Sequence, residues 1–212
     1  MQVVSTNIGK RRIVSWKGKE VETGIYKNPI SSGIYLQPND VKNDDVIDRR
    51  YHGGEYKACY LYGYEQYNHW RELFPDKELP MGMFGENLTV SGLDETVLCI
   101  GSAYKIGEAI VQISEPREPC FKLGIRFEDQ GVLKHFIRST YCGTYVSVLQ
   151  SGHVNAGDRF EPVEEQNGLS VSDVFELLYH DSVHPSTLED LISDTFLNPK
   201  KREKLLSKFC KV

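Results

Sequence analysis

The chain has 212 residues, 40% hydrophobic and 26% charged, with a formal net charge of −5 at pH 7. Such a composition is typical of a soluble globular protein with one domain, or one domain and a small appendage. The negative charge argues against a general nucleic-acid-binding surface, although a local lysine and arginine cluster could hold a small anion. No apolar run is long enough to span a membrane, and the N-terminus lacks a signal-peptide pattern, so a cytoplasmic protein is expected.

The first third of the chain predicts short β-strands. Residues 13–23 have the pattern of a β-hairpin whose turn lies at Lys17-Gly18. Residues 34–36 predict a further strand, and the polar block at 39–45 predicts a loop.

The segment 48–58 combines a glycine pair with basic residues. Gly53 and Gly54 permit positive φ angles and a close approach of the backbone to a ligand, and His52 and Lys57 stand on either side of them. The alternative is a tight turn with a solvated lysine, and the pattern alone does not decide between the two.

An aromatic helix is predicted at 63–74. Tyr64, Tyr67, Trp70 and Phe74 recur at a spacing that places them on one helical face. We expect this stripe to pack in the core or against a neighbouring domain.

Residues 82–90 predict a constrained loop that enters a strand. Glu86 and Asn87 are polar residues beside an apolar run, and buried polar side chains need partners, for which a ligand is one candidate. The alternative is an ordinary turn in which Asn87 bonds to the local backbone.

Three closely spaced strands are predicted next, at 97–100, 103–106 and 109–113. Regular short strands with glycine or proline at their ends are typical of a barrel or closed sheet. Further strands are predicted at 145–149 and 158–163, and a helix at 129–139.

The loop at 114–122 follows the last of the three closely spaced strands. Its two prolines prevent the strand from continuing and stiffen the loop. Cys120 stands between Arg117 and Lys122 in the sequence, and nearby positive charge favours the reactive thiolate form of a cysteine.

The composition changes after a polar linker at 164–168. Three short helices follow, with caps predicted at Ser170 or Ser172, at Ser186, and at Asn198 before a proline. We therefore predict two domains, a β-barrel domain at 1–166 and a three-helix domain at 167–212.

Familiar catalytic motifs are absent from the sequence. It has no GxSxG, P-loop, GxGxxG or HExxH pattern, and its five cysteines include no CxxC pair. Without a secretion signal, reduced thiols are expected, and Cys59 and Cys99 are predicted to be small core residues. A nucleophilic pair of Cys120 with His52 or His135 stays open, because sequence does not give their separation.

Three blocks together resemble the signatures of the MOSC-domain family. They are His52-Gly53-Gly54 with Lys57, then Phe84-Gly85-Glu86-Asn87-Leu88, then the segment from Ser114 to Lys122 with Cys120. The three-helix tail resembles that of the YiiM-like branch. The resemblance implies a mainly β, mixed α+β fold: a distorted closed β-barrel with peripheral helices and a small C-terminal three-helix domain.

The resemblance also implies a cofactor, the molybdenum cofactor, and not pyridoxal phosphate. Cys120 would be the metal ligand and catalytic residue. The cofactor-binding residues implied with it are His52, Gly53, Gly54, Lys57, Gly85, Glu86, Asn87, Ser114, Arg117 and Lys122. Glu115 stands where related sequences often carry glutamine, which adds a negative charge beside the expected site.

The reaction implied is the reduction of N-hydroxylated compounds, such as N-hydroxylated purines and amidoximes. No flavin or iron–sulfur motif is visible, so a separate electron-donor protein is expected, with no nucleic-acid or membrane partner. The alternative is a sulfur or molybdenum-cofactor carrier that uses Cys120 without reductase activity. A homodimer, the substrate and the role of the tail are left open by the sequence.

Overall fold

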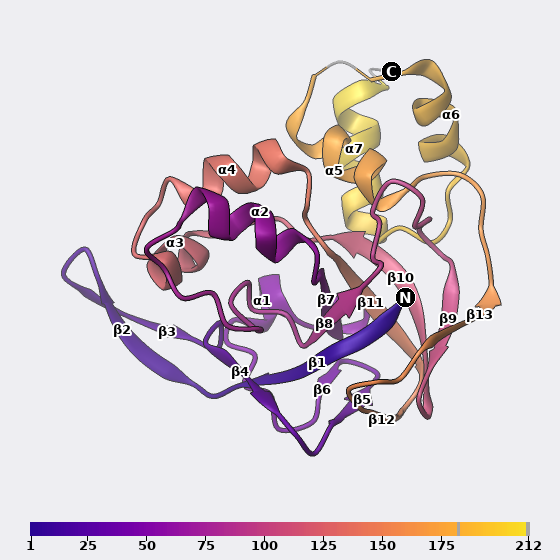
Figure 1. Ribbon diagram of the computed structural model, residues 1–212. Helices are drawn as coiled ribbons and strands as arrows, with labels where there is room; N and C mark the ends of the chain where they lie inside the picture. Colours follow the sequence, from indigo (N-terminus) through magenta and orange to yellow (C-terminus); the bar gives the residue numbers. More distant parts are fainter. Residues whose placement is uncertain (182, 211–212) are drawn as a thin grey trace.

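The structure, a computed structural model, describes residues 1–181 and 183–210. The fold is mixed α+β and is centred on an eight-stranded sheet (Figure 1). The strand order is β13-β9-β10-β11-β7-β8-β1-β4, in which β7 and β8 are parallel and the other neighbours are antiparallel. In chain order these strands are β1 (Gln2–Gly9), β4 (Lys27–Ile30), β7 (Cys59–Gly63), β8 (Leu88–Ser91), β9 (Ala103–Ile106), β10 (Ala109–Pro116), β11 (Thr144–Gln150) and β13 (Phe160–Glu164).

The sheet curves until β1 approaches the beginning of β13. An isolated antiparallel bridge joins Gln2 to Arg159. Val3 N–H donates to the Asp158 carbonyl at 2.9 Å, and Gly157 N–H donates to the Val3 carbonyl at 2.8 Å. The strand order is therefore open, and these few bonds connect one end of the sheet, at β13, to β1, the neighbour of the other end strand β4, where a continuously closed barrel was predicted.

Two smaller sheets lie beside the main one. One consists of β12 (Gly152–Val154), β5 (Ile34–Gln37) and β6 (Asp40–Val41), and the other is the hairpin of β2 (Arg12–Trp16) and β3 (Lys19–Thr23), which projects from the body (Figure 1). The hairpin confirms the prediction from the sequence. Its turn residues Lys17 and Gly18 both have positive φ, the conformation that matches the right-handed twist of the flanking strands.

The helices before the C-terminal region hold the aromatic core together. They are α1 (Arg49–His52), the 3-10 helix η1 (Glu55–Lys57), α2 (Gln66–Leu73), α3 (Phe121–Phe127) and α4 (Val132–Ser139). The predicted aromatic stripe packs inward, because Tyr67 and Trp70 are fully buried against Phe84 and Phe136. Offset and edge-to-face aromatic contacts of this kind stabilise a core beyond their buried area.

The C-terminal region contains α5 (Val171–Tyr179), α6 (Pro185–Ser193) and α7 (Pro199–Phe209). Ser170 forms a capping box with Asp173, and Asn198 caps α7, as predicted. The predicted cap at Ser186 is wrong: α6 begins one residue earlier, and the ring of His184 accepts the Ser186 N–H.

These helices pack on the sheet and share its core (Figure 1). Backbone bonds cross the junction, because Ile100 N–H donates to the Leu169 carbonyl and Val171 N–H to the Leu98 carbonyl, both at 2.9 Å. One hydrophobic cluster runs from the sheet into α5 and on to Leu205 of α7. The boundary near residue 166 stays a prediction, and the apolar packing across it is continuous.

The strand predicted at 97–100 is wrong. These residues form turns, Val97 is 72% exposed, and Cys99 makes only an isolated bridge, to Ser170. The N–H and the hydroxyl of Thr96 both donate to the Asp94 carboxylate. These bonds hold a turn just before residues 97–100, where a strand was predicted. Cys99 is consequently half-buried, whereas Cys59 lies in the core as predicted. None of the described helices combines the length and the apolar character needed to cross a bilayer.

Candidate functional site

A cavity lies where segments distant in the sequence meet. Its wall is formed by the end of the β2–β3 hairpin, the loop before α1, the ends of β7 and β8, and the segment between β10 and α3. Seven of the residues predicted from the sequence line the cavity, namely His52, Lys57, Gly85, Asn87, Arg117, Cys120 and Lys122. The lining residues not marked by the sequence include Lys27, Asp44, Asp45, Tyr60 and Tyr145.

Cys120 lies where this cavity meets a shallower outer groove, and it lines both. Pro119 precedes it and α3 begins directly after it, so its extended backbone is fixed from both sides. The thiol is half-buried and forms no disulfide in the described part of the chain. A soft sulfur donor is therefore held at the entrance of the cavity, and Lys122 borders the same two spaces.

Arg117 places a buried cation in the wall. It is 5% exposed, donates from Nη1 to the Phe84 carbonyl, and lies 4.8 Å from the centre of the Tyr60 ring. Burial opposes its charge, yet Tyr60, Tyr145 and Cys120 raise its pKa overall. Among the residues described, no carboxylate forms a salt bridge with Arg117, so its charge is available to a ligand.

His52 faces the same space and is neutral at pH 7. Burial, and then the charges of Arg117, Lys122 and Lys57, lower its pKa from 6.5 to about 4. Three cations act on one imidazole here, so the cavity has a positive potential. The His-Gly-Gly segment therefore brings a neutral hydrogen-bonding ring to the cavity and adds no charge.

Lys57 connects the cavity to a buried carboxylate. Its Nζ donates to the Tyr51 carbonyl at 3.0 Å and lies 3.1 Å from Oε1 of Glu115, whose side chain is fully buried. Glu115 faces Lys57 and does not line the cavity. Tyr145 borders this group. Burial raises the pKa of Tyr145 and the charge of Arg117 lowers it, and the net result is a rise to about 12.

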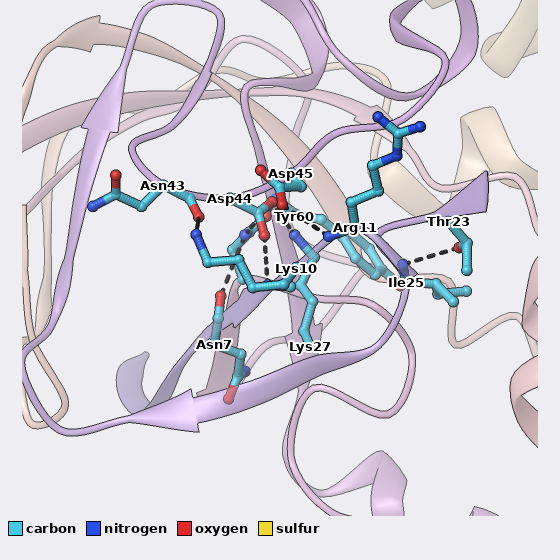
Figure 2. Close-up of polar contacts among 12 residues, drawn as sticks. Asn7, Lys10, Arg11, Thr23, Ile25, Lys27, Asn43, Asp44, Asp45 and Tyr60 are labelled. Atoms are coloured by element: carbon cyan, nitrogen blue, oxygen red, sulfur yellow. Dashed lines mark hydrogen bonds and ion pairs between the residues drawn. The ribbon is translucent and has the colours of Figure 1, made fainter. Parts of the chain in front are cut away.

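The opposite wall contains acidic residues that the sequence did not mark. Lys27 and Asp44 form a buried ion pair, and Asp44 also accepts from Gly9 N–H at 2.7 Å (Figure 2). Asp45 accepts the Arg11 N–H at 2.8 Å and so fixes the same loop to the end of β1 (Figure 2). Their separation from Cys120 along the chain explains why no local signal could assign them to this cavity.

Asn87 lines the cavity but is engaged at both ends of its amide. Its Nδ2 donates to Asp44 at 3.1 Å, and its Oδ1 accepts the Tyr60 N–H at 3.3 Å. Asn87 therefore joins the acidic wall to β7 and shapes the cavity, and its local-turn alternative is not what the structure shows.

Glu86 does not line the cavity. It is fully buried and accepts from Tyr67 Oη at 2.5 Å, Gly82 N–H at 2.7 Å, Phe84 N–H at 3.1 Å and Thr89 Oγ1 at 2.8 Å. The carboxylate thus organises the loop that carries Phe84, whose carbonyl in turn accepts from Arg117.

The remaining predicted residues lie at or beyond the rim. Ser114 donates to the Tyr56 carbonyl at 2.6 Å and does not line the cavity, so it anchors η1. Gly85 lines the cavity with φ of 81°, and an added Cβ would lie 3.0 Å from Ile25. Gly53 borders a separate outer groove, and Gly54, with φ of 93°, donates its N–H to the Asn39 carbonyl.

The choice between the two candidate histidines is decided by position. His52 shares the cavity with Cys120, whereas His135 packs edge-on against Phe74, 5.9 Å between ring centres, on α4. No cluster of three or more His, Cys, Asp or Glu side chains suited to a metal occurs in the part of the chain that is described. Cys120 is consequently a single soft donor among cations.

The three sequence blocks agree with the match of this chain to a known protein family. The MOSC domain pattern matches residues 48–161, which include Cys120 and the His-Gly-Gly segment. The chain belongs to the MOSC-domain family. It is 36% identical to the Bacillus subtilis protein YflK over 207 residues, 97% of this chain and 93% of that protein.

Two further relatives extend this family assignment. A protein of Gibberella moniliformis named "Reductase" is 34% identical over 69% of this chain, and the match covers 27% of that protein. The crystal structure of YiiM from Geobacillus stearothermophilus superposes with a TM-score of 0.81 at 29% identity and covers 98% of each chain. The superposition includes the C-terminal helices, as the resemblance to the YiiM-like branch implied.

Proposed function

We propose that this MOSC-domain protein binds the molybdenum cofactor through Cys120 and reduces N-hydroxylated compounds, such as N-hydroxylated purines and amidoximes. One observation carries the proposal: a single accessible thiol borders a cavity whose wall holds a buried arginine without a carboxylate partner among the described residues. Such a cavity combines a soft donor with a site for negative charge.

The residues present fit that cofactor. Molybdenum in its pterin complex receives most of its ligands from the cofactor itself, so the protein needs to supply only one soft donor, and Cys120 is suited to it. Lys57, Arg117 and Lys122 would hold the anionic phosphate of the pterin. His52, Asn87 and the backbone of Gly85 would shape the cavity around it, while Glu86, Ser114, Gly53 and Gly54 would support the loops that carry these groups.

The chemistry that the bound cofactor would supply is two-electron oxygen transfer, so that cleavage of the N–O bond, with two electrons and two protons overall, gives the amine or amidine and water. The protein would orient the cofactor and the substrate. His52 carries one ring N–H at pH 7, because its pKa is about 4, and so offers a neutral donor to a ligand. Arg117 remains protonated throughout, and it would balance negative charge without exchanging a proton.

A separate electron-donor protein belongs to this proposal. No flavin or iron–sulfur motif is visible in this sequence, and one relative, matched over 27% of its own length, is named "Reductase". The name supports the reaction class, and the substrate remains our proposal.

The test is to produce the protein in a host that makes the cofactor. Molybdenum by mass spectrometry, oxidised pterin by fluorescence, and turnover of benzamidoxime and 6-N-hydroxylaminopurine with reduced viologen would be measured for the native chain and for Cys120→Ser. We expect stoichiometric pterin and metal with turnover in the native chain, and loss of turnover in the variant. Cys99→Ser, which changes a half-buried thiol outside the cavity, is the matched control.

Two results would contradict the proposal. Native turnover in Cys120→Ser would remove Cys120 from the assigned role. A persulfide on Cys120 in protein that contains no molybdenum would instead favour the carrier function.

A further inference from the structure

Lys201 of α7 is a buried lysine that reaches from the C-terminal helices to the edge of the candidate site. It is 8% exposed, and its Nζ lies 2.8 Å from Oε1 of Glu118 and 3.4 Å from Oε1 of Glu115. Burial opposes ionisation of Glu118, yet Lys201 outweighs it and holds the pKa of that carboxyl below its usual value. Lysine side chains are seldom buried, so the burial of Lys201 needs a specific reason.

Glu115 provides that reason. Its carboxylate is fully buried, and neither oxygen receives a well-oriented hydrogen bond from the described residues. Two ammonium groups compensate the negative charge of Glu115. The Nζ atoms of Lys57 and Lys201 lie 3.1 Å and 3.4 Å from its Oε1. A buried carboxylate is costly when it loses its partners, so the two lysines share one essential task.

The two lysines differ in what else they can reach. Lys57 lines the cavity with Cys120, whereas Lys201 does not and is paired with Glu118. An anion that enters the cavity therefore meets Lys57 and competes with Glu115 for its charge. With Lys201 in place, Glu115 keeps a cation even when Lys57 turns to the ligand.

We propose that Lys201 is a positioning residue of the ligand site: by holding Glu115, it leaves the ammonium of Lys57 available to an anionic ligand in the cavity. The C-terminal helices are then a functional part of the site. This inference rests on the anionic ligand in the proposed function, and it is independent of the redox chemistry.

A consequence separates this role from a purely structural one. Removing the positive charge of Lys201 should weaken anion binding only while Glu115 is charged. When Glu115 is replaced by glutamine, nothing competes for Lys57, and Lys201 should no longer matter for the ligand. The two positions are therefore coupled in a way that a double-mutant cycle measures.

The experiment is calorimetry of the cofactor-free chain with inorganic phosphate and, separately, with molybdate as probes. The variants are Lys201→Met, Glu115→Gln, the double variant and Lys200→Met. Lys200 is the matched control, because it is an exposed lysine next to Lys201 on the same helix. Urea unfolding of each variant shows that it is folded under the binding conditions.

We expect Lys201→Met to weaken binding of the anion by roughly tenfold, within the range of coupling between contacting charges. Lys200→Met should stay within about twofold of the native chain, and the double variant should return to within about threefold of it. Glu115→Gln alone should bind at least as tightly as the native chain, which keeps the inference testable even if Lys201→Met does not fold.

Several results would overturn the inference. Native affinity in Lys201→Met, an equal loss in Lys200→Met, weaker binding by Glu115→Gln, or no recovery in the double variant would each contradict it while leaving the proposed function intact. Failure of the native chain to bind either anion would count against the anionic ligand itself, and hence against both proposals.

Discussion

Three positive charges lie around the thiol of Cys120, those of Lys57, Arg117 and Lys122. Other groups of the protein compensate these charges to different extents. Lys57 has a buried carboxylate beside it, whereas Arg117 relies on a carbonyl and an aromatic ring in the described structure. A guanidinium tolerates this because it is weakly hydrated and stacks on aromatic faces. Arg117 is therefore the residue whose charge a ligand would meet with least competition.

His52 gives a direct measure of that positive potential. Its pKa of about 4 lies below the unfolded value near 6.5, so the stability it contributes is present above pH 6.5 and is lost as the pH falls through 4. We expect the His52 ring proton in an NMR titration to change with a midpoint near pH 4. Phosphate should move the midpoint upward, because an anion offsets the three cations; an unshifted midpoint with and without phosphate would contradict the account. His52→Gln assigns the resonance.

Glu95 shows the opposite dependence on pH at the junction with α5. Burial raises its pKa from 4.5 to about 7, and Gly143 N–H, which donates to it at 2.9 Å, only partly offsets this. The folded protein favours the protonated form, so this contribution to stability is present below pH 4.5 and is lost as the pH rises through 7.

Glu95→Gln should therefore stabilise the protein at pH 7.5 by roughly 2–3 kcal/mol and hardly at all at pH 4.5. Urea unfolding at the two pH values measures this. Glu161→Gln, at an exposed position, is the control and should change neither value. An equal effect of Glu95→Gln at both pH values would show that the carboxyl does not titrate in this range.

For single residues, the sequence predicted which side chains belong to the site better than it predicted where those side chains point. Cys120, His52, Lys57, Arg117 and Lys122 do line one cavity. Arg117, Cys120 and Lys122 follow the proline that ends β10, and His52 and Lys57 stand on either side of the glycine pair before β7. Orientation depends on neighbours that are remote in the sequence. Glu86 faces donors of its own loop, of α2 and of β8, and not the cavity. No pattern at 82–90 distinguishes the two arrangements.

The loop from Gly82 to Gly85 is an element held by one carboxylate. Glu86 accepts from two of its N–H groups and from Tyr67 and Thr89. Glu86→Ala leaves these buried donors unpaired, so we expect it to destabilise the protein by roughly 3–5 kcal/mol in urea unfolding. Glu78→Ala, on an exposed part of the preceding loop, should change stability by less than about 0.5 kcal/mol. Equal effects of the two would show that Glu86 is not the support of this loop.

Hydrophobic periodicity predicted the helices and strands correctly where one face of the element is buried, and it failed elsewhere. The hairpin at 12–23 and the helices α2, α4, α5 and α7 follow from alternation or from the 3.6-residue repeat. No element is predicted from the sequence at β1, because its polar residues Ser5, Thr6 and Asn7 are buried by partners on neighbouring strands. No helix is predicted at α3 either, since seven residues after a proline-rich loop carry too short a pattern.

The molecule as a whole joins its C-terminal helices to the site by both packing and charge. Apolar contacts run continuously from the sheet to α7, and the ion pair of Lys201 with Glu115 adds a charged contact. The contact between residues 115 and 201 forms only in the folded chain. The polar linker at 164–168 does not indicate this contact. The composition change there marks where the chain leaves the sheet.

The central claim is that Cys120 is the protein's ligand to molybdenum in the cavity. X-ray absorption at the molybdenum edge measures this most directly, because it counts the sulfur atoms bound to the metal in the native chain and in Cys120→Ser, both loaded with cofactor. We expect one fewer sulfur ligand in the variant. An unchanged sulfur count in Cys120→Ser would contradict it.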